Sequence, residues 1–307
     1  MRSTHQALAD ERNATVEIYI NGEFFPRNEA KISVFDSGFL VGDGIWEGIR
    51  LHHGHLSYLD RHLDRLFAGA AATAIDIGLD RAGVTAALQE TIDRNDMHDN
   101  VHMRLMVTRG DKKTPSQHPS NCVGGSNIVI IAEHKAADPE VRDLGISLFT
   151  STVRRPPPDT LDQKLNCHSK LHEVIALIQA TTAGADEALM LDPTGAVATC
   201  NATNFFIVRA GEVWTSTGMY NLNGITSALV VEIAAEAGIR VHEAPFSLTE
   251  VYAADESFVT GTFGGLTPVH TIDGRTIGGG AAEDWAQGPM TVRLRELYDA
   301  HVAAQLT

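Results

Sequence analysis

The sequence is poor in cysteine. Only Cys122, Cys167 and Cys200 occur in 307 residues, and they lie far apart. An odd number of scattered cysteines argues against a disulfide framework and suits a reducing compartment, so we expect a cytoplasmic protein. No Cys-x-x-Cys pair occurs, and the histidine-rich run 52–55 has no acidic residue close beside it. We therefore expect no metal site.

Positive charge and long apolar runs are also scarce. The chain has 24 Lys and Arg against 39 Asp and Glu, a formal net charge of −15. Because a surface that neutralises phosphates must be basic, we expect no nucleic-acid partner. No apolar run approaches the ~20 residues of a membrane span. The polar N-terminal residues also lack the apolar core of a signal peptide, so we expect no membrane partner.

Strand-like and helix-like patterns are mixed along the chain, which predicts an α+β fold. The Asn21-Gly22 dipeptide between alternating apolar residues predicts a β-hairpin. Residues 59–75 and 81–95 have the periodicity of amphipathic helices. We expect four segments: an N-terminal extension over residues 1–16, a small N-terminal domain over 17–135, a polar interdomain linker over 136–145, and a larger C-terminal domain over 146–307.

Two lysines precede a helical pattern in the stretch LDQKLNCHSKLHEVIALIQA, residues 161–180. Lys164 and Lys170 are polar, and Leu171, Val174, Ile175 and Ile178 then follow at helical spacing. Ser169 as N-cap and Gly184 as stop predict a buried helix over residues 169–183. The lysines can be solvated residues at a helix start or include a Schiff-base nucleophile.

Three other features suit a phosphate group. Arg65 lies on a predicted helix, where a guanidinium can bind an oxyanion bidentately. Asn223–Thr226 (NGIT) opens a helix after a glycine, so free N–H groups and the helix dipole favour an anion. Thr260–Gly265 (TGTFGG) combines two hydroxyls with a glycine turn. Each feature alone is weak, since each also occurs as an ordinary surface arginine, cap or turn.

One glycine-rich run does not indicate a dinucleotide site. In VGDGIWEGIR, residues 41–50, the glycines are spaced one residue too widely for the nucleotide fingerprint, and the following pattern is that of a strand.

The order of motifs resembles a known family. GDGIWEGIR, LDRHLDRL, HMRLMVTRG, the lysine stretch, GADEALMLD, TNFFIV, NGIT and TGTFGGLTPV follow one another after residue 16. This order is similar to that of the class IV aminotransferases, the fold-type IV pyridoxal-phosphate enzymes, which include branched-chain and D-amino acid transaminases. The resemblance implies a small N-terminal α/β domain and a larger β-barrel-like α/β domain. It also implies pyridoxal 5′-phosphate, an amino donor with a 2-oxo acid acceptor, and a homodimer.

The resemblance also implies roles for single residues. Arg65, Ile225, Thr226 and Thr262 match phosphate ligands, and Leu222 matches the residue that packs on the cofactor ring. A second group matches the substrate site: Trp46 and Arg104 correspond to side-chain-pocket and carboxylate-recognition residues, and Phe263 and Gly264, after Thr262, correspond to a turn that binds the substrate carboxylate.

The catalytic lysine is less directly assigned by the resemblance. Counting back from Gln179-Ala180 places it near residue 165 or 166, so Lys164 is one or two residues early and Lys170 four or five late. Lys164 is the preferred candidate, because a small insertion after it is easier than a deletion of the loop. Lys170 then matches the position of a tyrosine near the cofactor hydroxyl.

The sequence departs from the family at Thr199, where the family has a glutamate facing the pyridine nitrogen. A hydroxyl cannot form the charge-assisted bond that a carboxylate forms there. The expected activity is transamination of an amino acid or small primary amine through a Schiff base on Lys164. The alternatives are a pyridoxal-phosphate lyase or racemase, or a catalytically weak homologue that binds the cofactor. Val41 and His102 stand where branched-chain enzymes carry tyrosine, which weakens a branched-chain assignment.

Overall fold

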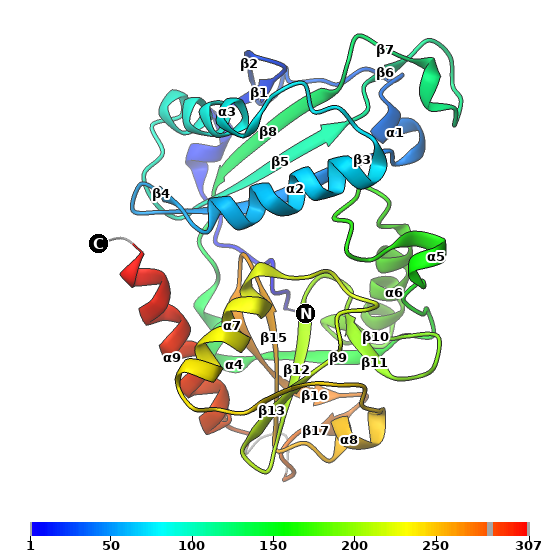
Figure 1. Cartoon of the computed structure of the whole chain (residues 1–307). Helices are drawn as coiled ribbons and strands as arrows, with labels where there is room; N and C mark the ends of the chain where they lie inside the picture. The colour runs from blue at the N-terminus through cyan, green and yellow to red at the C-terminus, as the bar shows by residue number, and fades with distance from the viewer. Residues whose placement is uncertain (1, 281–284, 306–307) are drawn as a thin grey trace. The chain divides into compact units, whose positions relative to one another are not determined.

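The computed structural model describes residues 2–280 and 285–305 (Figure 1). The chain divides into two compact units. Unit 1 comprises Met1–Ala7, Ala137–Lys164 and Leu171–Thr307, and unit 2 comprises Leu8–Ala136 and Leu165–Lys170. The predicted N-terminal extension is thus shared between the units, and the Leu165–Lys170 segment groups with the N-terminal half. The predicted linker contains helix α4 (Pro139–Leu144), whose Val141 is buried in a core of unit 1.

Unit 2 is built on a six-stranded sheet with the order β2-β1-β8-β5-β3-β4. Neighbouring strands pair antiparallel. The predicted hairpin is confirmed, because Asn21 and Gly22 both have positive φ, 53° and 92°, as a tight β1–β2 turn requires. The strands are β1 (Glu17–Ile20), β2 (Glu23–Pro26), β3 (Gly44–His52), β4 (His55–Leu56), β5 (Val101–Thr108) and β8 (Asn127–His134), with the short pair β6 (Asp111–Lys112) and β7 (Cys122–Val123) outside this sheet.

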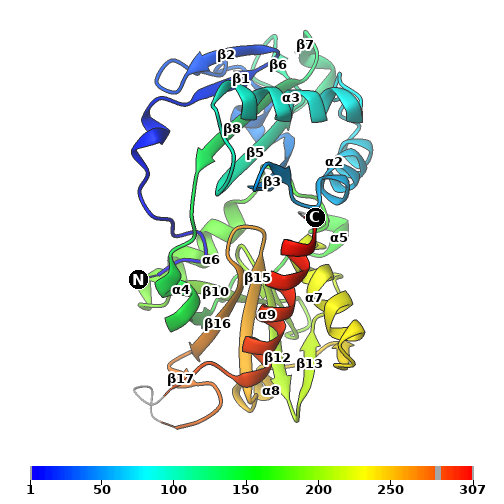
Figure 2. The same cartoon turned by 90° about the vertical axis from the view of Figure 1, so that its left-hand side faces the viewer.

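The alternation of buried and more exposed side chains along the strands shows which face of this sheet the helices cover. In β5, Val101, Met103, Leu105 and Val107 are fully buried, while the side chains between them are more exposed, apart from Thr108 at the strand end. The buried set forms one core with residues of helices α2 and α3, which lie along the same face of the sheet (Figure 2). The helical segments of unit 2 are η1 (Glu11–Ala14), α1 (Ser37–Val41), α2 (Leu59–Thr73), α3 (Arg81–Arg94) and η2 (Pro119–Asn121).

Unit 1 is built on a nine-stranded sheet with the order β11-β10-β9-β16-β15-β12-β13-β14, and β17 pairs with β16. Here β9 runs parallel to both β10 and β16, whereas β15 is antiparallel to β12 and β16. The strands are β9 (Ile146–Thr150), β10 (Glu187–Leu191), β11 (Val197–Cys200), β12 (Asn204–Arg209), β13 (Glu212–Thr215), β14 (Val241–Glu243), β15 (Glu256–Gly261), β16 (Gly265–Ile272) and β17 (Arg275–Thr276).

The helices of unit 1 pack on different parts of this sheet. Helices α7 and α9 lie side by side against β15 (Figure 2). Val230 and Ala234 of α7 share a core with Leu294 of α9 and Phe258 of β15. The helices of unit 1 are α4 (Pro139–Leu144), α5 (Pro158–Leu161), α6 (Leu171–Thr182), α7 (Ile225–Glu236), α8 (Leu248–Tyr252) and α9 (Pro289–Ala304).

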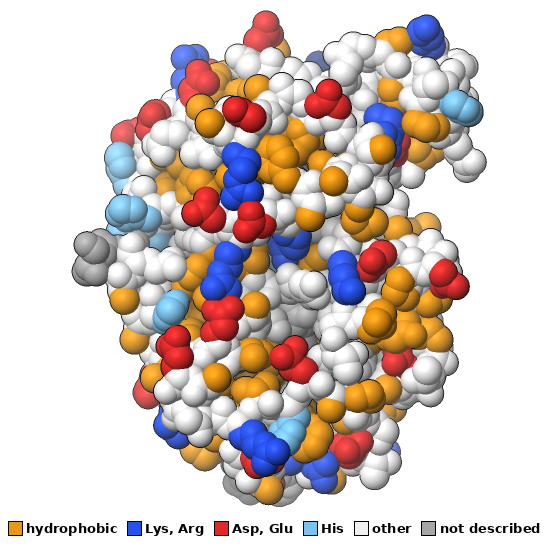
Figure 3. All heavy atoms as spheres, viewed as in Figure 1, with side chains coloured by type: hydrophobic (Ala, Val, Ile, Leu, Met, Phe, Trp, Pro, Cys, Tyr) orange, Lys and Arg blue, Asp and Glu red, His pale blue; other side chains and the backbone are white. Residues whose placement is uncertain are grey.

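The predicted helix after the lysines exists as α6, but the predicted buried face is wrong. Its large apolar residues are exposed, by 70% at Leu171 and 57% at Ile178. The buried positions are Ala176 and Ala180, which pack with Ala188 of β10. Small side chains let the helix approach the strand closely, and the large ones then point away from the core. Figure 3 shows hydrophobic side chains gathered over α6.

Candidate functional site

The predicted site residues fall in both units, and each part has its own architecture. In unit 2, Arg65 of α2 is held by a carboxylate that the sequence did not single out. Its Nε and Nη2 donate to Glu47 of β3 at 2.8 and 2.7 Å. His62 Nδ1 lies 2.7 Å from the same carboxylate. This two-point pairing fixes the plane of the Arg65 guanidinium on the helix.

Glu47 is buried, and its ionisation reflects its partners. Burial raises the pKa of the Glu47 carboxyl, but the hydrogen bonds from Arg65 and His62 outweigh that effect, and the pKa lies below its ordinary value. Glu47 is therefore a charged anchor for Arg65. Its signal in the sequence was a lone acidic residue in the otherwise apolar run GIWEGI, which leads into a buried strand.

Residues 165–170, which include the second candidate lysine, pair with β3. The N–H of Trp46 donates to the carbonyl of Asn166 at 2.8 Å, and the N–H of His168 donates to the carbonyl of Gly44 at 2.9 Å. The Trp46 indole Nε1 donates to the carbonyl of Cys167 at 3.1 Å. The Asn166 side chain is buried, and its Oδ1 finds no hydrogen-bond partner in the part of the chain that the structure describes.

Trp46 and Arg104, two of the predicted substrate-site residues, contact one another. They lie on neighbouring strands, with the Arg104 guanidinium carbon 4.1 Å from the centroid of the indole ring. Such a stack holds the arginine in one orientation. Burial lowers the pKa of Arg104 from its ordinary value, although an arginine stays charged at neutral pH.

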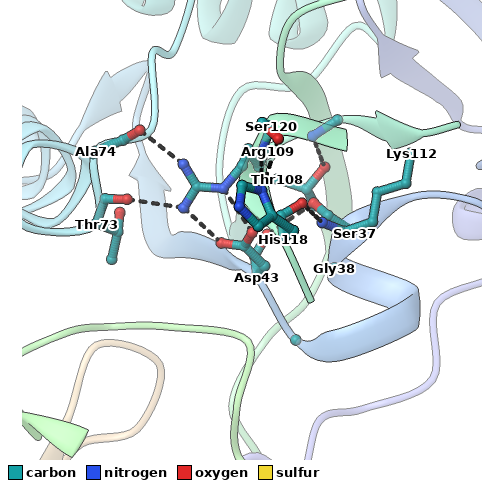
Figure 4. Close-up of polar contacts among 12 residues, drawn as sticks. Ser37, Gly38, Asp43, Thr73, Ala74, Thr108, Arg109, Lys112, His118 and Ser120 are labelled. Atoms are coloured by element: carbon teal, nitrogen blue, oxygen red, sulfur yellow. Dashed lines mark hydrogen bonds and ion pairs between the residues drawn. The ribbon is translucent and has the colours of Figure 1, made fainter. Parts of the chain in front are cut away.

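Arg109 fixes the start of β3, as Figure 4 shows. Its Nε and Nη2 donate to Asp43 at 2.7 and 2.9 Å. It also donates to the carbonyls of Thr73 and Ala74 at the end of α2, both at 2.8 Å. Arg109 therefore joins α2, which carries Arg65, to the strand that carries Trp46 and Glu47 (Figure 4).

In unit 1, the start of α7 has the properties of an anion site. Its N-cap is Gly224, which has no side chain to cap the helix. The N–H groups of a first helical turn have no intrahelical acceptor and lie at the positive end of the helix dipole. Ile225 and Thr226 are both buried there. Asn204 holds the preceding loop, because its Nδ2 donates to the carbonyl of Leu222 at 3.0 Å.

Gly224 is required by its surroundings. A Cβ added at this position would lie 2.0 Å from the Asn204 Oδ1 and 3.1 Å from its Cγ. The chain can therefore approach Asn204 only with glycine at this position. An uncapped helix start after a pinned glycine loop is the arrangement that binds phosphate groups.

Thr199 lies on β11 and is buried. Its hydroxyl donates to the carbonyl of Thr203 at 2.7 Å. Thr203 in turn donates from its hydroxyl to Glu187 at 3.1 Å. Burial raises the pKa of Glu187 above its ordinary value, although hydrogen bonds from Thr4 and Thr203 oppose the shift. The proton of Thr199 is engaged, so toward a ring nitrogen this oxygen can act only as an acceptor.

The turn between β15 and β16 contains Thr262, Phe263 and Gly264. Phe263 is buried, and Gly265 beyond it has a positive φ of 62°. Thr260, on β15 two residues before Thr262, is buried, and its Oγ1 has no hydrogen-bond partner among the described residues. A buried hydroxyl without a partner is costly unless a ligand or water completes it.

The two candidate lysines differ in their surroundings. Lys164 is in unit 1 and exposed, and its N–H donates to Asp162 Oδ1 at 2.9 Å. Lys170 is in unit 2 and half-buried, on the segment that pairs with β3. The sequence spacing and the burial therefore favour different lysines.

The residues fit the cofactor that the resemblance implies. In unit 1, the α7 start and Thr226 have N–H and hydroxyl donors that would suit a phosphate. In unit 2, Arg65 has a guanidinium of fixed orientation that would suit an anion. Within the described residues, no group of histidine, cysteine and acidic side chains could hold a metal ion. The helices of residues 2–280 and 285–305 include none long and apolar enough to cross a membrane.

Comparisons with known proteins agree with this geometry. The family model for amino-transferase class IV matches residues 44–272. The chain is 39% identical over 284 residues to a putative branched-chain-amino-acid aminotransferase of Methanocaldococcus jannaschii, covering 92% of this chain and 95% of that protein. It is 41% identical to branched-chain-amino-acid aminotransferase-like protein 1 of Arabidopsis thaliana, covering 93% of this chain. The chain spans only 50% of the Arabidopsis protein.

Solved structures give the same result. The branched-chain aminotransferase of the archaeon Thermoproteus uzoniensis, solved with norvaline, is similar with a TM-score of 0.83 and 27% identity, covering 94% of this chain and 95% of that chain. The prediction of an α+β, fold-type IV architecture is thereby confirmed. The chain belongs to the class IV aminotransferase family.

Proposed function

We propose that the chain transfers an amino group between an amino acid, or a small primary amine, and a 2-oxo acid, using pyridoxal 5′-phosphate. The observation that carries the proposal is the uncapped start of α7 after Gly224, in a chain of the class IV aminotransferase family. The bound cofactor would supply the electron sink for the amino-group transfer, and the protein would position and tune it.

The cofactor phosphate is assigned to two sets of donors. The backbone of Ile225 and Thr226 and the hydroxyl of Thr226 come from the α7 start, with Thr262 as a further ligand. The guanidinium of Arg65 supplies the charge, in the orientation that Glu47 imposes. Leu222 packs on the ring, in the loop that Asn204 holds.

The substrate is assigned to residues that combine apolar surface with carboxylate recognition. Trp46 and Phe263 supply apolar contacts, and Arg104, stacked on Trp46, supplies a cation for a carboxylate. The backbone N–H groups around Gly264 supply further donors to a carboxylate. This combination suits an amino acid and its 2-oxo acid.

One lysine must provide the amine that bonds covalently to the cofactor and then moves the Cα proton. We assign this role to Lys164, on the spacing of the sequence. Its exposed side chain in this structure makes the half-buried Lys170 the competing candidate. The two single substitutions to alanine separate the candidates.

A second activity, elimination or racemisation, is favoured by Thr199. Its hydroxyl is neutral and its proton is already donated to Thr203. A ring nitrogen facing it would lack the charged partner that deepens the electron sink. A protein that binds the cofactor with little turnover is the extreme case of the same effect.

We further propose a homodimer in the cytoplasm. Support for association comes from the exposed apolar residues of α6, Leu171, Val174, Ile175 and Ile178. Clustered apolar residues of this kind mark interaction surfaces. All three cysteines are unpaired, which suits a reducing compartment.

The proposed function is tested by incubating the protein with pyridoxal 5′-phosphate, L- or D-amino acids or primary amines, and 2-oxo acids. Products are separated by chiral chromatography. A new amino acid formed from the 2-oxo acid supports transamination. Free ammonia or an inverted donor without use of the 2-oxo acid supports the second activity. If no pair of amino donor and 2-oxo acid gives a product, both activities are contradicted.

A further inference from the structure

The N-terminal segment, defined as Arg2–Ala7, belongs to unit 1 and is fixed at both ends. At its start, the N–H of Arg2 donates to Asp186 Oδ1 at 2.5 Å. Near its end, the Gln6 Nε2 donates to Asp138 Oδ2 at 2.8 Å, and Ala7 forms an isolated β-bridge with Ala137. A polar terminal segment would otherwise be expected to lie loose in solvent.

The middle of the N-terminal segment enters the interior of unit 1. Thr4 is 5% exposed, and both its N–H and its hydroxyl donate to Glu187 Oε1. The other carboxylate oxygen of Glu187 accepts the hydroxyl of Thr203, whose carbonyl accepts the hydroxyl of Thr199. A continuous set of hydrogen bonds therefore runs from the N-terminal segment to the residue assigned to the ring nitrogen.

The same segment also lies against the turn assigned to the substrate carboxylate. The ring of His5 stacks on Phe263, with centroids 6.4 Å apart and planes at 15°. A Cβ added at Gly264 would lie 3.1 Å from the carbonyl oxygen of Thr4. Thr4 and His5 line one small cavity with Phe263, Gly264 and Thr203. The N-terminal segment thus packs against the turn.

This contact matters because the turn has little rigidity of its own. Gly261, Gly264 and Gly265 flank or form it, and glycine loses more conformational freedom than any other residue when it is ordered. A carboxylate site made of backbone N–H groups depends on these groups being held in place before the ligand arrives. In this turn, the stack of His5 on Phe263 and the close approach of the Thr4 carbonyl to Gly264 supply that restraint.

We propose that the N-terminal segment is a positioning element of the substrate-carboxylate turn, with Thr4 and His5 as its positioning residues. The carboxylate role rests on the proposed function. The mechanical role, restraint of residues 262–265, does not depend on it. The ligand concerned is the α-carboxylate of the amino acid or 2-oxo acid.

The mechanical role is tested by hydrogen exchange of the holoprotein, which reads the turn without turnover. His5→Ala and Thr4→Val are compared with Glu11→Gln, at an exposed position outside the N-terminal segment. We expect the amides of residues 262–265 to exchange roughly tenfold faster in the first two variants and unchanged in the control. Exchange within about twofold of the wild type in His5→Ala and Thr4→Val would overturn the proposal.

The carboxylate role is tested by steady-state kinetics with two donors, an amino acid and the matching primary amine without a carboxylate. His5→Ala should raise KM roughly tenfold for the amino acid and leave its kcat nearly unchanged. Both KM and kcat for the amine should stay nearly unchanged. His5→Phe, which keeps a stacking ring, should restore KM. An equal loss for both donors, or no rescue, would overturn this role. If the wild type turns over neither donor, the proposed function fails, and the hydrogen-exchange result still decides the restraint.

Discussion

The Thr199 hydroxyl donates a hydrogen bond of 2.7 Å to the carbonyl of Thr203. This bond leaves the Thr199 oxygen as an acceptor only, at the position assigned to the cofactor ring nitrogen. A neutral acceptor stabilises a protonated ring nitrogen less than a carboxylate does. If Thr199 faces the ring nitrogen as proposed, the balance between amino transfer and elimination or racemisation would depend on this residue.

Thr199→Glu is expected to speed the half-reaction with an amino donor roughly tenfold, equivalent to about 1.4 kcal/mol of barrier, because it places a charge opposite the ring nitrogen. Single-turnover absorbance measures the rate. Thr199→Gln is the matched control, since it has the same length without the charge. Equal rates in the two variants would show that charge at this position is not the controlling factor.

Glu47→Gln is expected to lower the free energy of unfolding by about 3 kcal/mol at pH 7, because Arg65 would lose its buried anionic partner. The pKa of Glu47 is lowered in the folded state, so its contribution is full above the unfolded value of about 4.3 and is lost as the pH falls through the folded value. The difference between variant and wild type should shrink in acid. Denaturant unfolding at several pH values measures it.

Two further results belong to the Glu47 experiment. Affinity for pyridoxal 5′-phosphate should also fall, because the guanidinium of Arg65 is no longer held in one plane. Glu90→Gln, at an exposed position of α3, is the control and should change neither property. A stability difference that persists unchanged at acid pH would contradict the charge-based explanation.

Gly224→Ala is expected to weaken cofactor binding and to destabilise the fold by about 1–3 kcal/mol, because the new methyl group would overlap the Asn204 carboxamide. Titration with pyridoxal 5′-phosphate and thermal unfolding measure the two effects. Gly69→Ala, in α2, is the control, since a Cβ there would meet only Ile45 of β3, at 3.6 and 3.8 Å. If Gly224→Ala still bound pyridoxal 5′-phosphate tightly, the α7 start would not be part of the phosphate site.

Ile178→Glu is expected to convert a homodimer to monomers, because it places a charge on the exposed apolar face of α6. Light scattering with size-exclusion chromatography measures the mass. Thr182→Glu, at an exposed polar position of the same helix, should stay dimeric. A dimer that survives Ile178→Glu would place the interface elsewhere.

Lys164→Ala is expected to abolish turnover, whereas Lys170→Ala should retain a measurable rate. The reason is that covalent attachment and proton transfer depend on the same amine. Borohydride reduction of the loaded wild type, followed by peptide mass spectrometry, identifies the attached lysine independently. Modification of Lys170, with activity surviving in Lys164→Ala, would reverse the assignment.

Features with strong local signals were predictable from the sequence. The β1–β2 hairpin follows from Asn21-Gly22, and the α7 start follows from the glycine before Ile225. The fold class followed from the order of motifs, which the family match and the solved structures confirm. The hairpin and the helix start depend on short stretches of chain, so neighbouring residues are sufficient to specify them.

Features that depend on distant partners were not predictable. The apolar spacing of α6 predicts a buried face, but the structure buries Ala176 and Ala180 instead, because helix position depends on what β10 presents. Glu47 could not be recognised as the partner of Arg65, which lies 18 positions later in the sequence. The contact of His5 with Phe263 joins residues far apart in the sequence, and no periodicity could indicate it.

The central claim, amino transfer on bound pyridoxal 5′-phosphate, is tested most directly by visible absorbance of the loaded protein before and after adding an amino donor without any 2-oxo acid. The account predicts a yellow protein whose visible band disappears with a suitable donor and returns on adding a 2-oxo acid. A protein that cannot be loaded with the cofactor, or whose band no donor changes, would contradict it.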